Sequence, residues 1–351
     1  MIAPSRAHRV LIILLALSSI LSFVYFVTDN SPVISWQPRP DYTSPPKWSP
    51  RVTKVSMLYG ERNVHYERAL HTHRRHAERW GYGMNVLQND IAVGYWNKPA
   101  YLLALVVAEL AKPARDRVEW FMWVDADSVV INPAIPLDIF LPPSELSDIH
   151  LVATKDHKGL NTGIFFIRVH QWTVKTLIET MGYPVYKPQV DLGAQADQTA
   201  MEKVLTQTSY RDGVTYLPRT WINTYEWAHA YEGGQGNMLV HFPGLGEKRW
   251  EHMSKWLDIV ESTPEEGEVP LAETWYPRET EQFWSRLQVA KRLVRDCERK
   301  LTDKGSSATA GFQDMQQAVD KLRKVLQEEP YEAELMGQRI KECNVALDVS
   351  T

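Results

Sequence analysis

The stretch Trp120–Pro133, WFMWVDADSVVINP, decides the fold because it joins a buried strand to two aspartates. Trp120–Val124 is aromatic and apolar, and no charge precedes Asp125. Such a run is typical of a strand that is covered on both faces, at the centre of an α/β sheet. Since side chains alternate along a strand, Asp125 and Asp127 are expected on the same side at its carboxyl end, where ligands bind in open α/β sheets.

The two aspartates favour a metal site. Carboxylate oxygens are hard ligands, which suit a divalent cation that also takes phosphate oxygens, such as Mg²⁺ or Mn²⁺. An Asp-x-Asp triplet also occurs at ordinary solvated turns, so the rest of the chain has to separate these two interpretations.

Strands and helices alternate on both sides of this segment, which predicts a mixed, mostly parallel sheet flanked by helices. The other expected strands are Val52–Tyr59, Met84–Leu87, His150–Thr154, Gly163–Val169, Val214–Leu217 and Met238–His241, the last two closing the sheet. The expected helices are Tyr66–Trp80, Tyr101–Leu110, Val174–Met181, Thr199–Leu205 and Trp250–Val260.

Composition limits the function classes. The chain has 351 residues, 44% apolar and 23% charged, and can bury a large core. Its net charge of −4 argues against generic nucleic-acid binding, which needs a basic face. The two cysteines, Cys297 and Cys343, allow at most one disulfide, so the fold cannot depend on a disulfide framework. The chain contains no Asn-x-Ser/Thr glycosylation site.

The N-terminal segment predicts a membrane anchor. Val10–Val27 is 18 residues without a charge, about 27 Å as a helix, close to the thickness of the hydrocarbon core. Arg6 and Arg9 precede it and Asp29 follows, which places the short N-terminus in the cytosol. The alternative is a cleaved signal peptide, whose apolar region is usually shorter and is followed by a small-residue cleavage site.

The chain is therefore expected to divide into five parts. These are a cytosolic tail (1–9), a transmembrane signal anchor (10–27), a stem with six prolines (28–50), a catalytic domain (51–263) and a helical C-terminal extension (264–351).

The extension contains two charged helices, Glu279–Lys300 and Gln313–Glu328. Leu287, Val294 and Leu301 recur every seven residues, which indicates an amphipathic surface for a homo- or hetero-oligomeric partner. A helical cap on the main domain is the alternative.

Three more polar segments follow the aspartates. Leu160–Arg168, LNTGIFFIR, is a turn that runs into a buried strand. Ala196–Met201, ADQTAM, begins a helix, where Asp197 could be an N-cap or a carboxylate aimed into a cleft. Asn237–Trp250, NMLVHFPGLGEKRW, ends a strand with His241 and continues through a glycine-rich turn into a basic pair that could bind phosphate.

The joint occurrence of these motifs resembles glycosyltransferase family 34. That family includes fungal α-galactosyltransferases, α-1,6-mannosyltransferase subunits and plant xyloglucan xylosyltransferases. The resemblance spans about Thr53–Leu257 and also includes RHAERWGYG and WNKPAYLLAL. Many glycosyltransferases share the DxD triplet, and the LNTG strand, the Asp-Gln pair and HFPG narrow the resemblance to this family.

The resemblance implies a GT-A fold, with a Rossmann-like mixed sheet, and retaining transfer from a nucleotide sugar. Asp125, Asp127 and His241 would hold Mn²⁺, which bridges the donor diphosphate. Asp197 and Gln198 match the catalytic pair beside the anomeric carbon. A double displacement needs a carboxylate nucleophile, whereas a same-face route does not; the glutamine favours the same-face route.

Donor and acceptor binding would fall, by the same resemblance, to Lys98, Asn161, Thr162, Gly163 and Lys248. Two departures from the family pattern stand out. Plant members have an acid where this chain has Ala196. The phosphate-binding lysine expected soon after the histidine has no obvious equivalent, so Lys248 is the first candidate and Arg249 the second.

These features together predict a Golgi type II membrane protein that is an Mn²⁺-dependent retaining α-hexosyltransferase. UDP-galactose is the first expected donor and GDP-mannose the second, with a glycan acceptor in protein glycosylation or cell-wall mannan synthesis. The alternatives are a non-catalytic or partner-dependent subunit of a Golgi mannosyltransferase complex, and a metal-dependent phosphohydrolase that uses the same aspartates.

Overall fold

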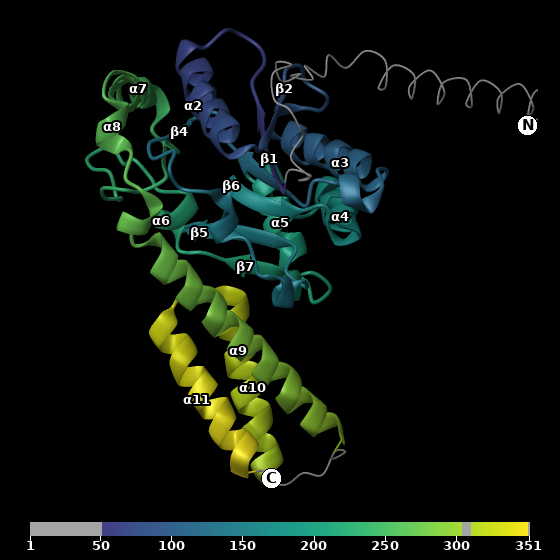
Figure 1. Ribbon diagram of the computed structural model, residues 1–351. Helices are drawn as coiled ribbons and strands as arrows, with labels where there is room; N and C mark the ends of the chain where they lie inside the picture. The colour runs from purple at the N-terminus through teal and green to yellow at the C-terminus, as the bar shows by residue number, and fades with distance from the viewer. Residues whose placement is uncertain (1–50, 304–309, 350–351) are drawn as a thin grey trace, which may run out of the picture. The chain divides into compact units, whose positions relative to one another are not determined.

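The structure, a computed structural model, describes residues 51–303 and 310–349 (Figure 1). The predicted tail, anchor and stem therefore lie outside the described residues. Within these two ranges, no helix combines the length and the apolar character needed to cross a membrane.

The main sheet has six strands in the order β2-β1-β3-β6-β5-β7. Their bounds are Val52–Met57 (β1), Gly83–Leu87 (β2), Trp120–Val124 (β3), Leu151–Asp156 (β5), Gly159–Arg168 (β6) and Val214–Tyr216 (β7). β1 is parallel to β2 and to β3, and β7 is parallel to β5. β6 is antiparallel to both of its neighbours, β3 and β5. The prediction of a mixed α/β sheet is confirmed.

A second, two-stranded sheet pairs β4 (Ser128–Val130) with β8 (Leu239–His241) in antiparallel register. The prediction that Met238–His241 closes the main sheet is therefore wrong. The chain turns directly after β3, and β4 leaves the main sheet at that turn. Ser128 then lies opposite His241. This small sheet carries His241 to the end of β3.

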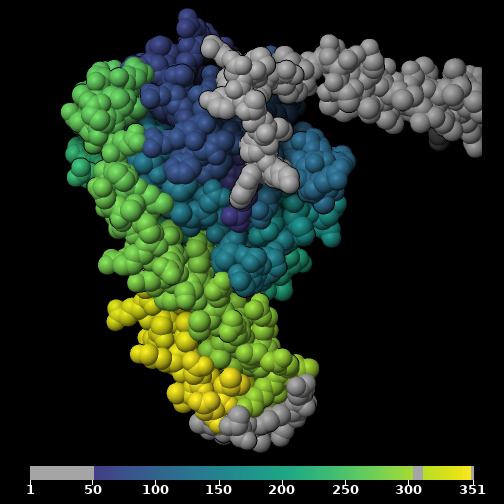
Figure 2. All heavy atoms as spheres, in the orientation of Figure 1, coloured from purple at the N-terminus to yellow at the C-terminus, as the bar shows by residue number. Residues whose placement is uncertain are grey.

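Seven helices in 51–267 surround the two sheets. They are α2 (Val64–Trp80), α3 (Asn97–Leu110), α4 (Gln171–Tyr186), α5 (Ala196–Leu205), α6 (Arg219–Ile222), α7 (Arg249–Ser262) and α8 (Pro264–Gly267). Short 3₁₀ turns lie at 94–96, 114–116, 137–140, 144–146, 211–213, 246–248 and 271–273. The surfaces of α2 and α7 adjoin in Figure 2, and Arg68 of α2 forms ion pairs with Asp258 and Glu261 of α7.

The alternating side chains of β3 divide the core between the two faces of the sheet. Phe121 and Trp123 pack with apolar residues of α3, α4 and α5. Trp120, Met122 and Val124 belong to a second core that continues into the C-terminal helices. All five residues are at most 1% exposed, so the prediction of a central strand covered on both faces is confirmed.

Three helices complete the described chain: α9 (Tyr276–Asp303), α10 (Ala310–Glu328) and α11 (Ala333–Val349). The sequence predicted the first two and missed α11. Leu287 and Val294, two positions of the seven-residue repeat, are buried in the same core as β3. The repeat therefore packs inside the chain, as the helical-cap alternative requires.

α9 is tied directly to the region of the small sheet. The hydroxyl of Tyr276 donates to the carbonyl of Trp221 (2.9 Å) and accepts from the amide of Met238 (3.1 Å). Farther along, Cys297 and Cys343 are both fully buried and unpaired.

Candidate metal centre and active site

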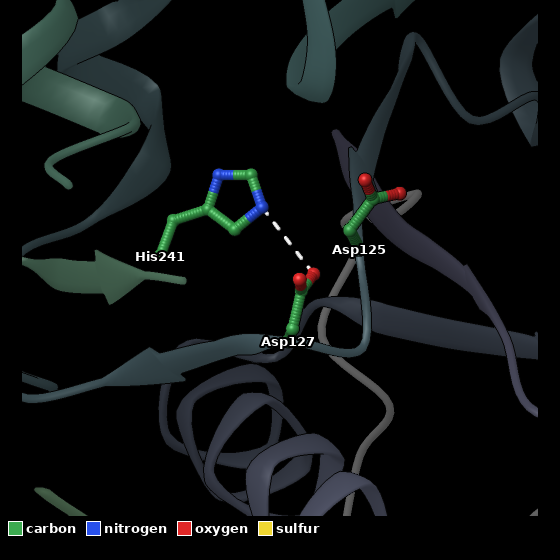
Figure 3. Close-up of side chains that lie close together, drawn as sticks. All are labelled: Asp125, Asp127 and His241. Atoms are coloured by element: carbon green, nitrogen blue, oxygen red, sulfur yellow. Dashed lines mark ion pairs between the residues drawn. The ribbon is translucent and has the colours of Figure 1, made fainter. Parts of the chain in front are cut away.

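Asp125, Asp127 and His241 converge where β3, β4 and β8 meet (Figure 3). One possible ligand atom from each residue lies within 4.8 Å of the other two. The predicted grouping of these residues is present, but strand alternation does not produce it. β3 ends at Val124, and a turn over residues 125–127 brings the two carboxylates together.

Asp125 is held by its surroundings. Its backbone amide donates to the carbonyl of Gly163 (2.8 Å), and its Oδ1 accepts from the indole Nε1 of Trp123 (2.7 Å). The ammonium Nζ of Lys98 lies 3.1 Å from the same oxygen. Lys98 itself is buried, so this positive charge is confined beside the aspartate.

Asp127 lies between the imidazole of His241 and the guanidinium of Arg249. Its Oδ1 is 3.3 Å from Nε2 of His241, and its Oδ2 is 3.3 Å from Nη1 of Arg249. Burial raises the pKa of the Asp127 carboxyl, but the charges of His241 and Arg249 and the hydrogen bond from His241 outweigh it, and the net pKa is lowered. The carboxyl is therefore ionised and available as a ligand at neutral pH.

The hydrogen bonds of Asn223 fix the orientation of His241. The amide nitrogen of Asn223 donates to Thr154 (3.0 Å) and to Asn161 (2.8 Å). Its oxygen therefore accepts, and Nδ1 of His241, 2.7 Å away, must carry the proton. Nε2 is therefore the nitrogen that faces Asp127, and a bound cation would take the place of a proton there. Metal-binding histidines are oriented in this way by a hydrogen bond at the other nitrogen.

The donor set fits a divalent cation. Two carboxylates and one imidazole nitrogen are a combination that first-row divalent ions accept, Mn²⁺ among them. Three protein ligands also leave coordination positions for a substrate.

Gly163 makes room for the imidazole. A Cβ atom at this position would lie 2.4 Å from Cε1 of His241 and 3.0 Å from Oδ1 of Asn161. Only glycine allows the ring to approach β6 so closely. This gives a physical reason for the glycine in the LNTG motif.

Asn161 lies behind His241, in a buried network. Its Oδ1 accepts from the amide of Gly163 (2.9 Å) and from Asn223, and its Nδ2 donates to Asp156 (3.1 Å). These contacts make Asn161 part of the support of the histidine; its place at the donor–acceptor junction, implied by the family resemblance, stays a prediction.

Thr162 links two other candidate residues. Its amide and hydroxyl donate to Oε1 of Gln198, at 2.9 and 3.1 Å. Its carbonyl accepts from Nζ of Lys98 at 2.8 Å. Lys98 and Gln198 are thus fixed on either side of one strand residue, although they come from different helices.

Asp197 lies in the first turn of α5 and is 5% exposed. Burial raises the pKa of its carboxyl, the charge of Lys98 opposes this, and Asp125 adds to it, with a net pKa above the usual value. Asp197 therefore shares the charged surroundings of Lys98 and Asp125, next to the metal cluster.

The two basic candidates after His241 differ in position. Lys248 is exposed at the start of α7. Arg249 points inward, where it donates to the carbonyl of Phe242 (3.1 Å) and to the hydroxyl of Tyr66 (2.8 Å), besides its ion pair with Asp127. The structure therefore brings Arg249, the second candidate, to the cluster and leaves Lys248 outside it.

Sequence reasoning missed two residues that support the cluster, Asn223 and Tyr225. The ring of Tyr225 packs edge-on against His241, with ring centroids 5.5 Å apart, and its hydroxyl donates to Asp156 (3.0 Å). The segment that carries them follows the short helix α6 and has no motif, so neither residue could be recognised from the sequence.

Comparison with known proteins finds similarity to glycosyltransferases. Residues 143–250 match the galactosyl transferase GMA12/MNN10 family. An α-1,2-galactosyltransferase of Schizosaccharomyces pombe is 24% identical over 208 residues, which cover 49% of this chain and 54% of that protein. This chain is therefore distantly similar to this glycosyltransferase family. The matched segment contains Asp197, Gln198 and His241, whereas the two aspartates precede it.

Plant proteins are similar at the same level. Xyloglucan 6-xylosyltransferase 2 of Arabidopsis thaliana is 26% identical over 203 residues, 50% of this chain and 41% of that protein. The chain thus spans about half the length, or less, of these relatives. Among solved structures, a glycosyltransferase involved in glycosylation of the major capsid of PBCV-1 superposes with a TM-score of 0.47 at 15% identity, covering 59% of this chain and 100% of that one.

Proposed function

We propose that the protein is a GT-A retaining hexosyltransferase that uses a divalent cation, Mn²⁺ first, to bind a nucleotide-sugar donor. The observation that carries this proposal is the convergence of Asp125, Asp127 and His241, in a chain whose residues 143–250 match the GMA12/MNN10 family. In this proposal residues 51–263 form the catalytic domain and 264–351 a helical extension.

The metal ligands and the two cationic side chains beside them contribute in different ways to donor binding. A bound cation offsets the negative charge that develops on the departing diphosphate. Lys98, beside Asp125, and Arg249, beside Asp127, add fixed positive charges. Since both cations are held by hydrogen bonds to the protein, they keep their positions before the donor arrives.

Asp197 and Gln198 act on the sugar in this proposal. The Oε1 of Gln198 is already occupied by Thr162, so the amide is held in one orientation at the edge of the cluster. Asp197, buried beside the charge of Lys98, supplies the carboxylate that orients the sugar or stabilises its positive charge in the transition state. The glutamine at this position favours the same-face route over a double displacement.

The donor is proposed as UDP-galactose, with GDP-mannose second. The similarity to a protein named as an α-1,2-galactosyltransferase supports galactose. The plant relatives named as xyloglucan 6-xylosyltransferases add UDP-xylose to the donors that have to be compared. A glycan acceptor follows from the same family.

We also propose a place for the protein: the Golgi membrane, in type II orientation, with the catalytic domain in the lumen. The support is the uncharged segment Val10–Val27 and the basic residues before it. Carbonate extraction of membranes tests the anchor, because an anchored chain stays in the pellet. Protease treatment of sealed vesicles tests the orientation, because a lumenal domain is protected until detergent is added.

Nucleotide release tests the activity. The purified full chain is incubated with Mn²⁺ and, in separate reactions, UDP-galactose, UDP-glucose, UDP-xylose and GDP-mannose, with and without mannobiose. Release with one donor, abolished by EDTA, supports the proposal and names the sugar. Free sugar without an elongated acceptor would instead indicate a hydrolase. Silence with every donor, relieved by a co-purified partner, would favour the partner-dependent subunit.

A further inference from the structure

A chain of buried hydrogen bonds leads from β1 to the aspartate turn. Nζ of Lys54 lies 3.2 Å from Nδ1 of His73 in α2. Nε2 of His73 lies 3.0 Å from the hydroxyl and 3.1 Å from the carbonyl of Ser128. The Ser128 hydroxyl in turn donates to the carbonyl of Asp125 at 2.6 Å. All three side chains are at most 1% exposed.

The chemistry of the partners fixes the direction of every bond. The carbonyl of Asp125 can only accept, so the hydroxyl of Ser128 donates to it. That hydroxyl then accepts from Nε2–H of His73, as does the Ser128 carbonyl. Nδ1 of His73 is therefore the bare nitrogen and accepts from the amine of Lys54. Each bond of the chain thus has one donor and one acceptor, and the chain ends on the backbone of a metal-ligand candidate.

Ser128 connects this chain to all three proposed ligands. It follows Asp127 directly, bonds to Asp125, and pairs with His241 across the small sheet. A shift of Ser128 would therefore move both aspartates relative to the histidine.

Core packing alone does not account for Lys54. The side chain is 1% exposed, and burial lowers the pKa of its amine well below the usual value. A buried amine weakens the fold relative to an apolar side chain of similar size. Its hydrogen bond to His73 is the specific interaction that an apolar residue could not replace.

We propose that Lys54 and His73 are positioning residues of the metal centre, which hold the turn 125–128 in its metal-binding conformation through Ser128. This role rests on the proposed function, since it presupposes that the cluster binds a divalent cation.

Mn²⁺ affinity tests the proposal without reference to catalysis. Free Mn²⁺ is measured by electron paramagnetic resonance during titration of the purified full chain, and thermal unfolding is followed in parallel. Ser128→Ala removes only the hydroxyl, and His73→Leu removes both ring nitrogens. We expect each to weaken Mn²⁺ binding by about tenfold or more, as is usual when the partners of metal ligands are lost. Lys54→Met should have a smaller effect in the same direction.

Two variants separate positioning from stability. His73→Gln keeps an N–H donor near the place of Nε2 and should recover most of the affinity lost in His73→Leu. His76→Leu is the matched control. His76 is equally buried in the same helix, but its Nε2 bonds to the carbonyl of Ile135 (2.8 Å) and not to the turn. It should lower the melting temperature and leave Mn²⁺ affinity unchanged.

The outcomes distinguish this inference from the proposed function. If the native chain binds Mn²⁺ and Ser128→Ala and His73→Leu bind it equally well, the positioning role is refuted while the metal site stands. Equal losses in His73→Leu and His76→Leu would also refute it, because a general loosening of the fold would then explain both. If the native chain binds no divalent cation, the proposed function itself fails.

Discussion

Gly163→Ala adds a single methyl group and should be enough to disrupt the metal centre. The new Cβ would lie 2.4 Å from Cε1 of His241, where carbon atoms normally approach to about 3.5 Å. One of the two must therefore move by roughly 1 Å. The ring cannot turn away cheaply, because it is 2% exposed and its Nδ1 is held by Asn223 at 2.7 Å.

Two effects follow from that displacement. Metal–ligand distances tolerate only about 0.2 Å, so a shift of roughly 1 Å removes His241 from the ligand set. We expect Mn²⁺ affinity to fall by about 10- to 100-fold. Overpacking of a buried site should also lower the free energy of unfolding by about 1–3 kcal/mol.

A double-mutant cycle with His241→Ala checks that the clash is the cause. Mn²⁺ affinity and the free energy of unfolding are measured for both single variants and the double variant. Once the ring is absent, adding Gly163→Ala should produce almost no further loss of either quantity, so the two changes should be strongly non-additive. Gly234→Ala is the control, because a Cβ there meets no atom within 4 Å.

The reasoning is wrong if Gly163→Ala binds Mn²⁺ like the native chain and unfolds at the same temperature. It is also wrong if the losses of the two single variants simply add. Either result would mean that the imidazole has room to move, or that it is not a ligand.

Three further predictions concern other residues. Asp197→Asn should lower turnover more than donor affinity. It should also raise the stability of the metal-free protein at pH 7, because burial disfavours the ionised carboxyl of Asp197. Thermal unfolding should show this gain disappear as the pH falls to about 3.9 and below, where the carboxyl is protonated in both the folded and the unfolded state. Arg249→Gln should raise the KM for the donor by about tenfold or more. Lys248→Gln should change it less, because Arg249 contacts Asp127 whereas Lys248 is exposed. Similar donor KM values for the two variants would contradict this prediction. Cys297 and Cys343 should resist a thiol reagent until the protein is unfolded, because both side chains are fully buried. Burial also raises the pKa of the Cys343 thiol to about 12, so little reactive thiolate is present. Rapid labelling of the native chain would contradict the packing of α9 against α11.

The central strand was predictable from sequence because its signal is local. Five consecutive apolar residues before Asp125 can be accommodated only where both faces of a sheet are covered. The convergence of the two aspartates was also predicted, but for the wrong reason. A turn of three residues brings them together, and apolar periodicity carries no information on the shape of such a turn.

Pairing between distant segments was not predictable in the same way. β8 consists of two apolar residues and His241, and would suit an edge of the main sheet as well as a partner for β4. Its actual pairing depends on the path of the chain after the aspartate turn. The place of His241 in the metal centre therefore came from the family resemblance and not from the residues themselves.

Helix ends and the last helix show a further limit. α4 was expected to stop at Met181, before Gly182, yet it continues to Tyr186 with Pro184 inside it. Glycine and proline raise the free energy of a helix, but tertiary packing overrides them here. α11 contains Gly337, and its sequence lacks a clear start signal, so its burial against α9 and α10 could be seen only in the structure.

The most direct test of the account is Mn²⁺-dependent nucleotide release by the native chain and by Asp127→Ala, measured side by side. Asp127 lies in a turn and adds little to the core, so the variant should keep its fold. The account predicts that release by the native chain rises with Mn²⁺ to saturation, falls to background with EDTA, and is absent in the variant at every Mn²⁺ concentration. Release that needs no divalent cation, or that survives in a folded Asp127→Ala variant, would contradict the assignment of this cluster as the metal centre of a glycosyltransferase.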